Sequence, residues 1–136
     1  MLRGTLEIRD VHAEVIQYCR AELLEDNYAY AVLEATKSVF DRVRDLTEFT
    51  DDGAQLMDKA FGGGTPILAI NALTSESEIS EQRGFVNLAK GVYGMFRNPT
   101  AQEARIKWSM GRADAEDLLS LVSLIHRRLD GVGKRS

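Results

Sequence analysis

The stretch YAYAVLEATKSVFDRVRDL, residues 28–46, decides the fold class of this chain. Its apolar residues recur at spacings of three and four, which places them on one face of an α-helix. These residues are Tyr28, Val32, Ala35, Val39, Val43 and Leu46, with Leu33 and Phe40 beside them. A face this wide predicts a helix that lies centrally in the core.

The same spacing extends outward from this helix. It predicts further long helices over residues 8–24, 81–97 and 113–130, and a short helix over residues 54–61. The apolar run PILAINAL, residues 66–73, is either extended or a short buried helical turn. The alternation typical of strands is absent from the sequence, as is any internal repeat. We therefore predict an all-α fold, a bundle of four long helices with short helical turns.

Length and composition agree with a single domain. The chain has 136 residues, of which 44% are hydrophobic, enough to bury a core without disulfides or metals. We expect one helical domain over residues 1–136, with its core over about 8–130 and a frayed tail over 131–136. Gly91 and Gly94 suggest close approach of another helix, within the bundle or between subunits.

Charge and cysteine content exclude several classes of protein. A formal net charge of −4 argues against coating duplex DNA by bulk attraction. The single cysteine, Cys19, cannot form an internal disulfide, which favours a reducing compartment and a cytoplasmic location. The charged opening MLRGTLEIRD and the lack of an 18-residue apolar window argue against secretion and membrane insertion. Two histidines and one cysteine give no zinc pattern, so we expect no metal and no cofactor.

Chemistry is concentrated in the segment MFRNPTAQEARIKW, residues 95–108. Pro99 disfavours helix at Asn98, so the preceding helix should stop near Arg97, and Asn98 can then cap a new turn. Arg97 and Gln102 would then point into one cleft. The guanidinium of Arg97 suits phosphate oxygens. A purely structural interpretation stays open, in which Arg97 neutralises a helix end and Asn98 only caps.

Basic residues on either side of this segment strengthen the phosphate interpretation. They are Lys90, Arg105, Lys107 and Arg112. Together they would make this part of the surface positive on an acidic chain, so an RNA backbone is a plausible ligand.

The order Arg97-Asn98-Pro99-Thr100-Ala101-Gln102-Glu103 resembles the Arg-Asn-Pro-x-Ala-His-Glu segment of the Ymh family, bacterial and phage proteins of undefined function usually grouped with the HEPN superfamily. The resemblance covers roughly residues 8–130. Its other segments are Asp26-Asn27-Tyr28, Ala31-Val32-Leu33-Glu34-Ala35, Arg42-Val43-Arg44, Asp52-Gly53, Leu56-Met57, Gln82-Arg83-Gly84-Phe85 and Arg128-Leu129-Asp130.

The resemblance implies a HEPN-like bundle that pairs as a homodimer, with two Arg-x-x-x-x-His motifs facing one another. HEPN ribonucleases cleave RNA without metal, the histidine moving protons and the arginine stabilising the phosphorane, and many are toxins or antiphage effectors. Transferred to this chain, the arginine role falls on Arg97 and the polar second position on Asn98. Gln102 occupies the histidine position. An antitoxin or a larger defence protein is a further partner that the resemblance allows.

Glutamine at position 102 changes the expected chemistry. An amide cannot exchange a proton near neutral pH, so general acid–base help of about 10²- to 10⁴-fold would be lost. Gln102 is either a deliberate replacement that silences a nuclease, or a native residue of a domain that binds without cutting, or compensated by another group. His12 and His126 are the only other candidates, and a lone histidine is more often structural. We therefore expect an impaired or inactive endoribonuclease, the alternative being a non-catalytic dimerisation, adaptor or RNA-binding module.

Overall fold

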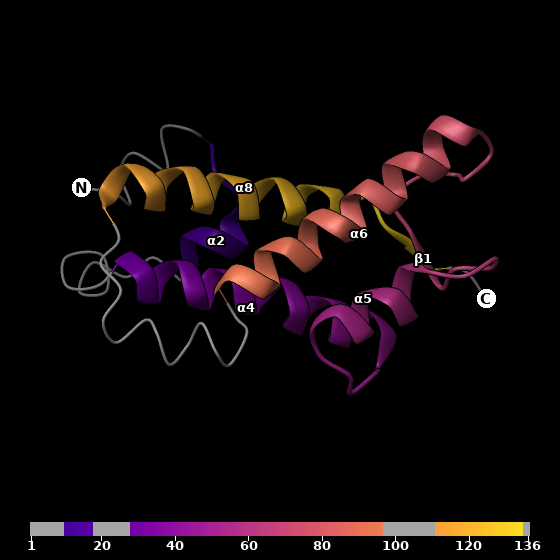
Figure 1. Ribbon diagram of the computed structural model, residues 1–136, viewed down its shortest axis with the longest axis horizontal. Coiled ribbons are helices and arrows are strands. Elements are labelled where there is room, and N and C mark those ends of the chain that lie inside the picture. Colours follow the sequence, from indigo (N-terminus) through magenta and orange to yellow (C-terminus); the bar gives the residue numbers. More distant parts are fainter. Residues whose placement is uncertain (1–9, 18–27, 97–110, 135–136) are drawn as a thin grey trace.

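A computed structural model describes residues 10–17, 28–96 and 111–134. Over these residues the chain forms five helices and two very short strands (Figure 1). In chain order they are α2 (Ala13–Gln17), α4 (Tyr28–Thr47), α5 (Gly53–Phe61), β1 (Leu68–Ala69), α6 (Glu76–Phe96), α8 (Arg112–Asp130) and β2 (Gly133–Lys134). The predicted all-α class is confirmed. Three of the four predicted long helices correspond to α4, α6 and α8, and the fourth, over 8–24, is described only at α2, since its second half lies outside the described residues.

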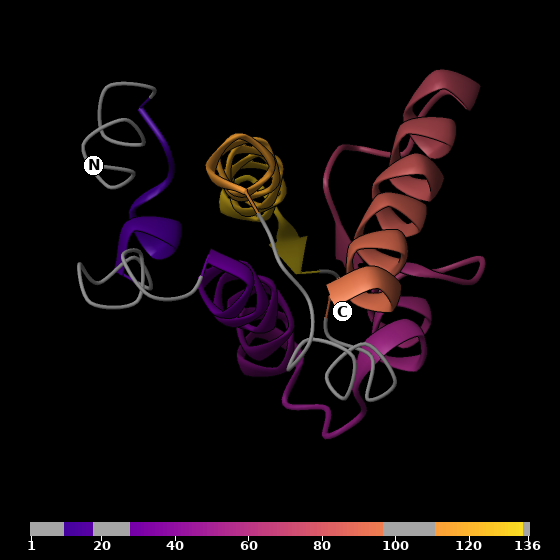
Figure 2. The same cartoon turned by 60° about the vertical axis from the view of Figure 1, so that its left-hand side comes forward.

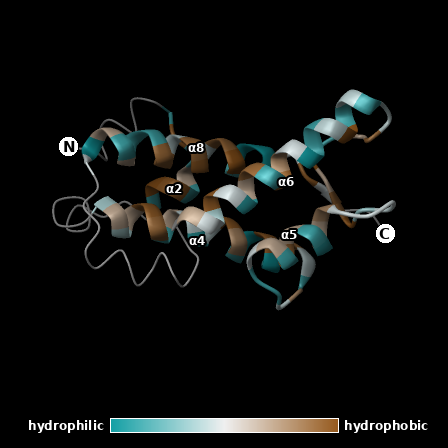
Figure 3. Cartoon of the chain, viewed as in Figure 1, coloured by the Kyte–Doolittle hydropathy of each residue, from teal (hydrophilic) through white to brown (hydrophobic). Residues whose placement is uncertain are grey.

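The central position predicted for residues 28–46 is confirmed. Helix α4 packs against α2, α5, α6 and α8 (Figures 1 and 2). Its inward side chains, among them Val32, Val39 and Val43, are fully buried. One cluster of buried apolar residues joins all five helices. Figure 3 shows the same arrangement as hydrophobic stretches of α2, α4 and α8 that lie toward the middle, with hydrophilic first turns on α6 and α8.

The first helix begins later than predicted. A start at Ile8 is wrong, because residues 10–12 are not helical and α2 begins at Ala13. The carbonyl of His12 accepts the amides of Val15 and Ile16, and its ring Nδ1 accepts the amide of Glu14. These bonds satisfy amides that every helix start leaves without partners. His12 therefore fixes where α2 begins.

The third long helix begins five residues earlier than the predicted position 81. The hydroxyl of Ser75 accepts the amide of Glu78, while the Glu78 carboxylate accepts both the amide and the hydroxyl of Thr74. These three hydrogen bonds work like a capping box and start α6 at Glu76. Among the described residues nothing lies within 4 Å of a side chain added at Gly91 or Gly94, so none of the described helices approaches either glycine closely.

The end of the chain also differs from the expectation of a frayed tail. Gly133 pairs with Ala69 and Lys134 with Leu68 in a two-residue antiparallel ladder. Strand β1 is buried, so the extended form of the 66–73 run is the observed one. The ladder attaches the end of α8 to the connection between α5 and α6.

Candidate functional site

Most of the residues predicted for the site lie outside the described residues. Arg97, Asn98, Gln102, Arg105 and Lys107 all belong to positions 97–110. Helix α6 ends at Phe96, the residue before Arg97, and α8 begins at Arg112. The segment therefore connects the end of one long helix to the start of another.

The two basic neighbours that the structure describes are both ion-paired. Lys90 lies 2.5 Å from a carboxylate oxygen of Asp58, and the Arg112 Nε donates to Glu116 over 2.9 Å. Exposed pairs of this kind contribute little to stability, but each carboxylate reduces the local positive potential. Lys90 and Arg112 thus contribute less positive potential to the predicted basic surface than the sequence suggests.

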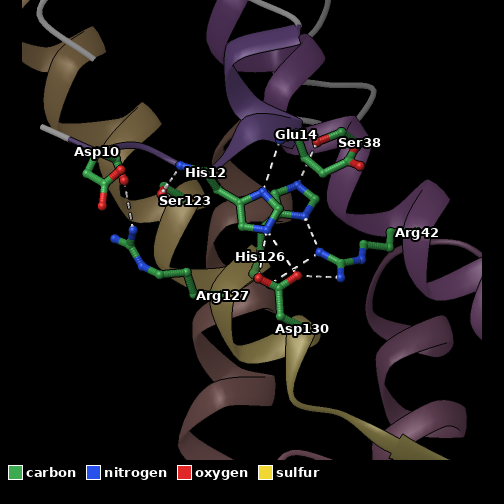
Figure 4. A network of polar contacts seen from close by, with 9 residues as sticks. All are labelled: Asp10, His12, Glu14, Ser38, Arg42, Ser123, His126, Arg127 and Asp130. Atoms are coloured by element: carbon green, nitrogen blue, oxygen red, sulfur yellow. Dashed lines mark hydrogen bonds and ion pairs between the residues drawn. The ribbon is translucent and has the colours of Figure 1, made fainter. Parts of the chain in front are cut away.

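The structure brings together a different cluster of ionisable residues, which sequence reasoning treated as separate positions (Figure 4). The rings of His12 and His126 stack with centroids 5.1 Å apart and planes 26° apart. Asp130 and Arg42 lie beside the two rings, and Ser38 contacts the ring of His126. These residues come from α4, α8 and the segment before α2. We call this set the His12–His126 cluster.

His126 is a buried residue with both ring nitrogens occupied. Its side chain has 0% exposure. Because a guanidinium can only donate, Nδ1 accepts from Arg42 at 3.2 Å. Nε2 then carries the hydrogen and donates to the Ser38 hydroxyl at 2.9 Å, which in turn donates to the Ala35 carbonyl at 2.5 Å. Every polar atom of the imidazole is satisfied.

The same surroundings keep His126 uncharged. Burial, together with the neighbouring His12 and Arg42, lowers the pKa of His126 from its ordinary 6.5 to about 4. Because the neutral ring has one donor and one acceptor, it fits a site that offers a hydroxyl on one side and a cation on the other. His126 is thus a neutral structural histidine near pH 7, as the sequence favoured.

Asp130 connects the cluster to the protein surface. Its carboxylate accepts from Arg42 Nη2 at 2.6 Å and from His12 Nε2 at 2.9 and 3.0 Å. The hydrogen bond from Arg42 holds the pKa of Asp130 below its usual range. His12 uses its other nitrogen to accept the Glu14 amide at 3.0 Å. The opposite charges of Arg42 and Asp130 thus neutralise one another, and Asp130 also orients the His12 ring. These groups lie at a half-exposed edge of the cluster.

The cluster does not have the geometry of a Ser-His-Asp triad. In a triad the carboxylate holds the histidine that contacts the serine. Here Arg42 occupies that place on His126, and Asp130 instead contacts His12. Ser38 is buried within α4 and donates to its own helix. The arrangement supports a structural tie between α2, α4 and α8, in which the ring nitrogens of both histidines are already hydrogen-bonded.

Helix α8 secures the segment before α2 at two further points. The backbone amide of His12 donates to the buried Ser123 hydroxyl at 2.8 Å, and Arg127 donates to the Asp10 carbonyl at 3.1 Å. Both contacts cross more than 100 positions of sequence.

Among the described residues, no group of three or more His, Cys, Asp or Glu side chains is placed to share a metal ion. None of the helices in that part has the length and apolarity needed to cross a bilayer.

A comparison with known protein families matches a region that includes the 97–110 segment and all of the His12–His126 cluster except Asp130. A family described as "Protein of unknown function (Hypoth_ymh)" matches residues 9–129. The chain belongs to the Ymh family. No curated protein and no solved structure matches it. Membership in the Ymh family therefore comes without an assigned activity.

Sequence reasoning missed the His12–His126 cluster because its members lie far apart along the chain. Two of its residues, Arg42 and Asp130, do fall in segments that resemble the Ymh family pattern. In the structure they bond directly to one another. Nothing in the sequence shows that these two segments meet, so the contact appears only in the structure.

Proposed function

We propose that this Ymh protein is a HEPN-like domain that pairs as a homodimer and holds RNA phosphate on Arg97 and Asn98. In this proposal it is related to metal-independent endoribonucleases of toxin or antiphage-defence type. Gln102 in the histidine position leaves it inactive or impaired as a nuclease. Family membership over residues 9–129 and the all-α bundle support this proposal.

The single observation that carries the proposal is the position of the motif. Arg97 comes directly after Phe96, the last described residue of α6, and the order Arg97-Asn98-Pro99 resembles the family pattern. A guanidinium offers a planar fork of donors that fits phosphate oxygens. Without a histidine, electrostatic stabilisation remains but proton transfer does not.

The proposal is tested by restoring the missing group. Gln102→His should produce RNA cleavage in the presence of EDTA, at least about 100-fold above the unsubstituted chain. The double variant Gln102→His, Arg97→Ala should lose that activity, whereas Gln102→His, Arg128→Ala should retain it as the matched control. Intact RNA with the folded Gln102→His variant would contradict the ribonuclease relationship.

A specific surface feature favours the alternative of a dimerisation or adaptor module. No residue in the described part of the chain lies within 4 Å of a side chain added at the α6 glycines 84, 91 and 94, and the Met95 side chain is 64% exposed. A hollow of about 180 Å³ lies between α6 and α8, with Leu88 and Leu124 in its lining. An apolar surface of this kind suits contact with another helix. If the folded Gln102→His variant leaves RNA intact while the protein still self-associates, the adaptor function is preferred.

A further inference from the structure

A second, larger hollow lies at the end of the bundle where α5 finishes and α6 begins. Its volume is about 440 Å³, within the range of small-molecule sites of about 300–1,000 Å³. The lining consists of the last residue of α5, the loop that follows it, and the first turns of α6 with the residue Leu73 before them. These residues are Phe61, Gly62, Gly63, Gly64, Pro66, Leu73, Ile79, Gln82 and Arg83. All of these lining residues are outside the 97–110 segment.

The inner wall of this hollow is fixed by a buried amide. Gln82 is 3% exposed, and its Nε2 donates to the carbonyls of Phe61 and Leu68 at 2.9 and 3.2 Å. Its Oε1 accepts the Ile70 amide at 2.9 Å. One side chain of α6 thereby holds the end of α5 and both ends of the β1 region. The hollow is preformed, which reduces the ordering that a ligand would have to impose.

The outer wall contains a strained residue that is held in place. Leu73 has φ of 56°, in the left-handed region that side chains with a branched body rarely adopt. Its amide donates to Asn71 Oδ1 at 2.9 Å, and Asn71 Nδ2 donates to Glu78 and Glu81 of α6. These hydrogen bonds hold the backbone of Leu73 in its strained conformation at the wall of the hollow.

The lining is mostly apolar with one positive group. Ile79 is 39% exposed at the rim, an apolar surface that lacks a cover among the described residues. Arg83 is the only charged lining residue, and no described carboxylate pairs with it. Opposite them, nothing lies within 4 Å of a side chain added at Gly63 or Gly64, which keeps the entrance open.

We propose that this hollow binds a small organic anion with an apolar body. The apolar body packs against Phe61, Pro66 and Ile79, and the carboxylate or phosphate accepts hydrogen bonds from the guanidinium of Arg83. Neither family membership nor the RNA proposal assigns a ligand to this place. The inference is independent of the proposed function, because it depends on no residue of the 97–110 segment.

The test uses three simple probes that share one ring: phenylacetate, phenyl phosphate and the neutral phenethyl alcohol. Each is titrated into the full chain labelled with ¹⁵N, and amide shifts are followed for Gly62, Gly63, Gly64 and Ile79. We expect at least one anion to shift these amides and to bind about tenfold more tightly than the alcohol. A carboxylate preference and a phosphate preference are distinguished by comparing the two anions.

Two variants separate charge from shape. Arg83→Gln should remove the preference for the anion while weak binding of the alcohol persists, and Ile79→Ala should weaken all three probes. Arg128→Gln is the matched control, since it removes an exposed arginine that lines the other hollow. Equal binding of anion and alcohol, an anion preference that survives in Arg83→Gln, or shifts confined to other residues would each overturn the proposal.

Discussion

Removal of the His126 imidazole should flatten the acid dependence of stability. In the unfolded chain His126 takes up its proton near 6.5, whereas in the folded chain burial lowers the pKa to about 4. Between these values the unfolded state binds more protons, so the free energy of unfolding falls as the pH falls. Above pH 6.5, protonation of His126 in the unfolded chain no longer reduces the free energy of unfolding. A difference of about 2.5 pH units at about 1.36 kcal/mol each gives a loss of about 3 kcal/mol by pH 4.

Urea unfolding followed by circular dichroism at pH 7.5, 6.5, 5.5 and 4.5 measures this dependence. His126→Gln keeps a polar amide in the site but does not titrate, so between pH 7.5 and 4.5 its stability should change by about 2.5 kcal/mol less than that of the unsubstituted chain. His12→Gln removes the other histidine and should retain most of the slope. The reasoning is refuted if His126 of the folded chain titrates near 6.5 by NMR, or if the slope disappears with His12 instead.

Three further substitutions test the packing and hydrogen bonds that hold the framework. Ser38→Ala leaves the buried Nε2–H of His126 without an acceptor and should lower the free energy of unfolding by about 1–3 kcal/mol, measured by urea unfolding at pH 7.5. Gln82→Leu leaves three backbone groups of the α5–β1 region without their partner and should cost about 3 kcal/mol or more, with faster amide exchange at Ile70 as the local sign. Gly53→Ala forces a methyl group to 2.7 Å from a tyrosine ring of α6 and should cost more than about 2 kcal/mol, whereas Gly63→Ala, also at positive φ but in open space, should cost about 1 kcal/mol; equal losses of thermal stability would contradict this account.

The parts of the fold that the sequence predicts are those determined by local periodicity. Helix α4 is found within one residue of the predicted end because its apolar face repeats through its whole length. The start of α6 is missed because Thr74, Ser75 and Glu78 fix it with polar bonds that leave no trace in an apolar pattern. The ladder between β1 and β2 involves two residues on each side, too few for any alternation to register.

The face of α8 is only approximately predicted. The spacing of Leu118, Leu121, Val122, Ile125 and Leu129 predicts an apolar stripe with Leu119 beside it. In the structure Leu119 is fully buried, whereas Leu118 and Leu121 are partly exposed. Several adjacent leucines make the direction of the apolar face ambiguous, and contact with α4 decides it. His126 is buried on the same side because Ser38 and Arg42 supply its hydrogen bonds.

The candidate site, like the fold, could be predicted from the sequence only in part. Segments that resemble the Ymh family outside residues 97–103 include Arg42, Arg44, Gln82 and Asp130, and all four hold the framework together through hydrogen bonds. Those positions therefore report on the fold rather than on an activity. The His12–His126 cluster could not be predicted, since it requires α8 to meet the segment before α2 across more than 100 residues.

Affinity for RNA tests the central claim most directly. Fluorescence anisotropy with a labelled single-stranded RNA, at two salt concentrations, compares the unsubstituted chain with Arg97→Ala and with Arg128→Ala. We predict binding that weakens as salt rises, a loss of about tenfold in Arg97→Ala and less than about twofold in Arg128→Ala. Binding that is equal in all three proteins, or absent from the unsubstituted chain, would contradict the claim that Arg97 holds an RNA phosphate.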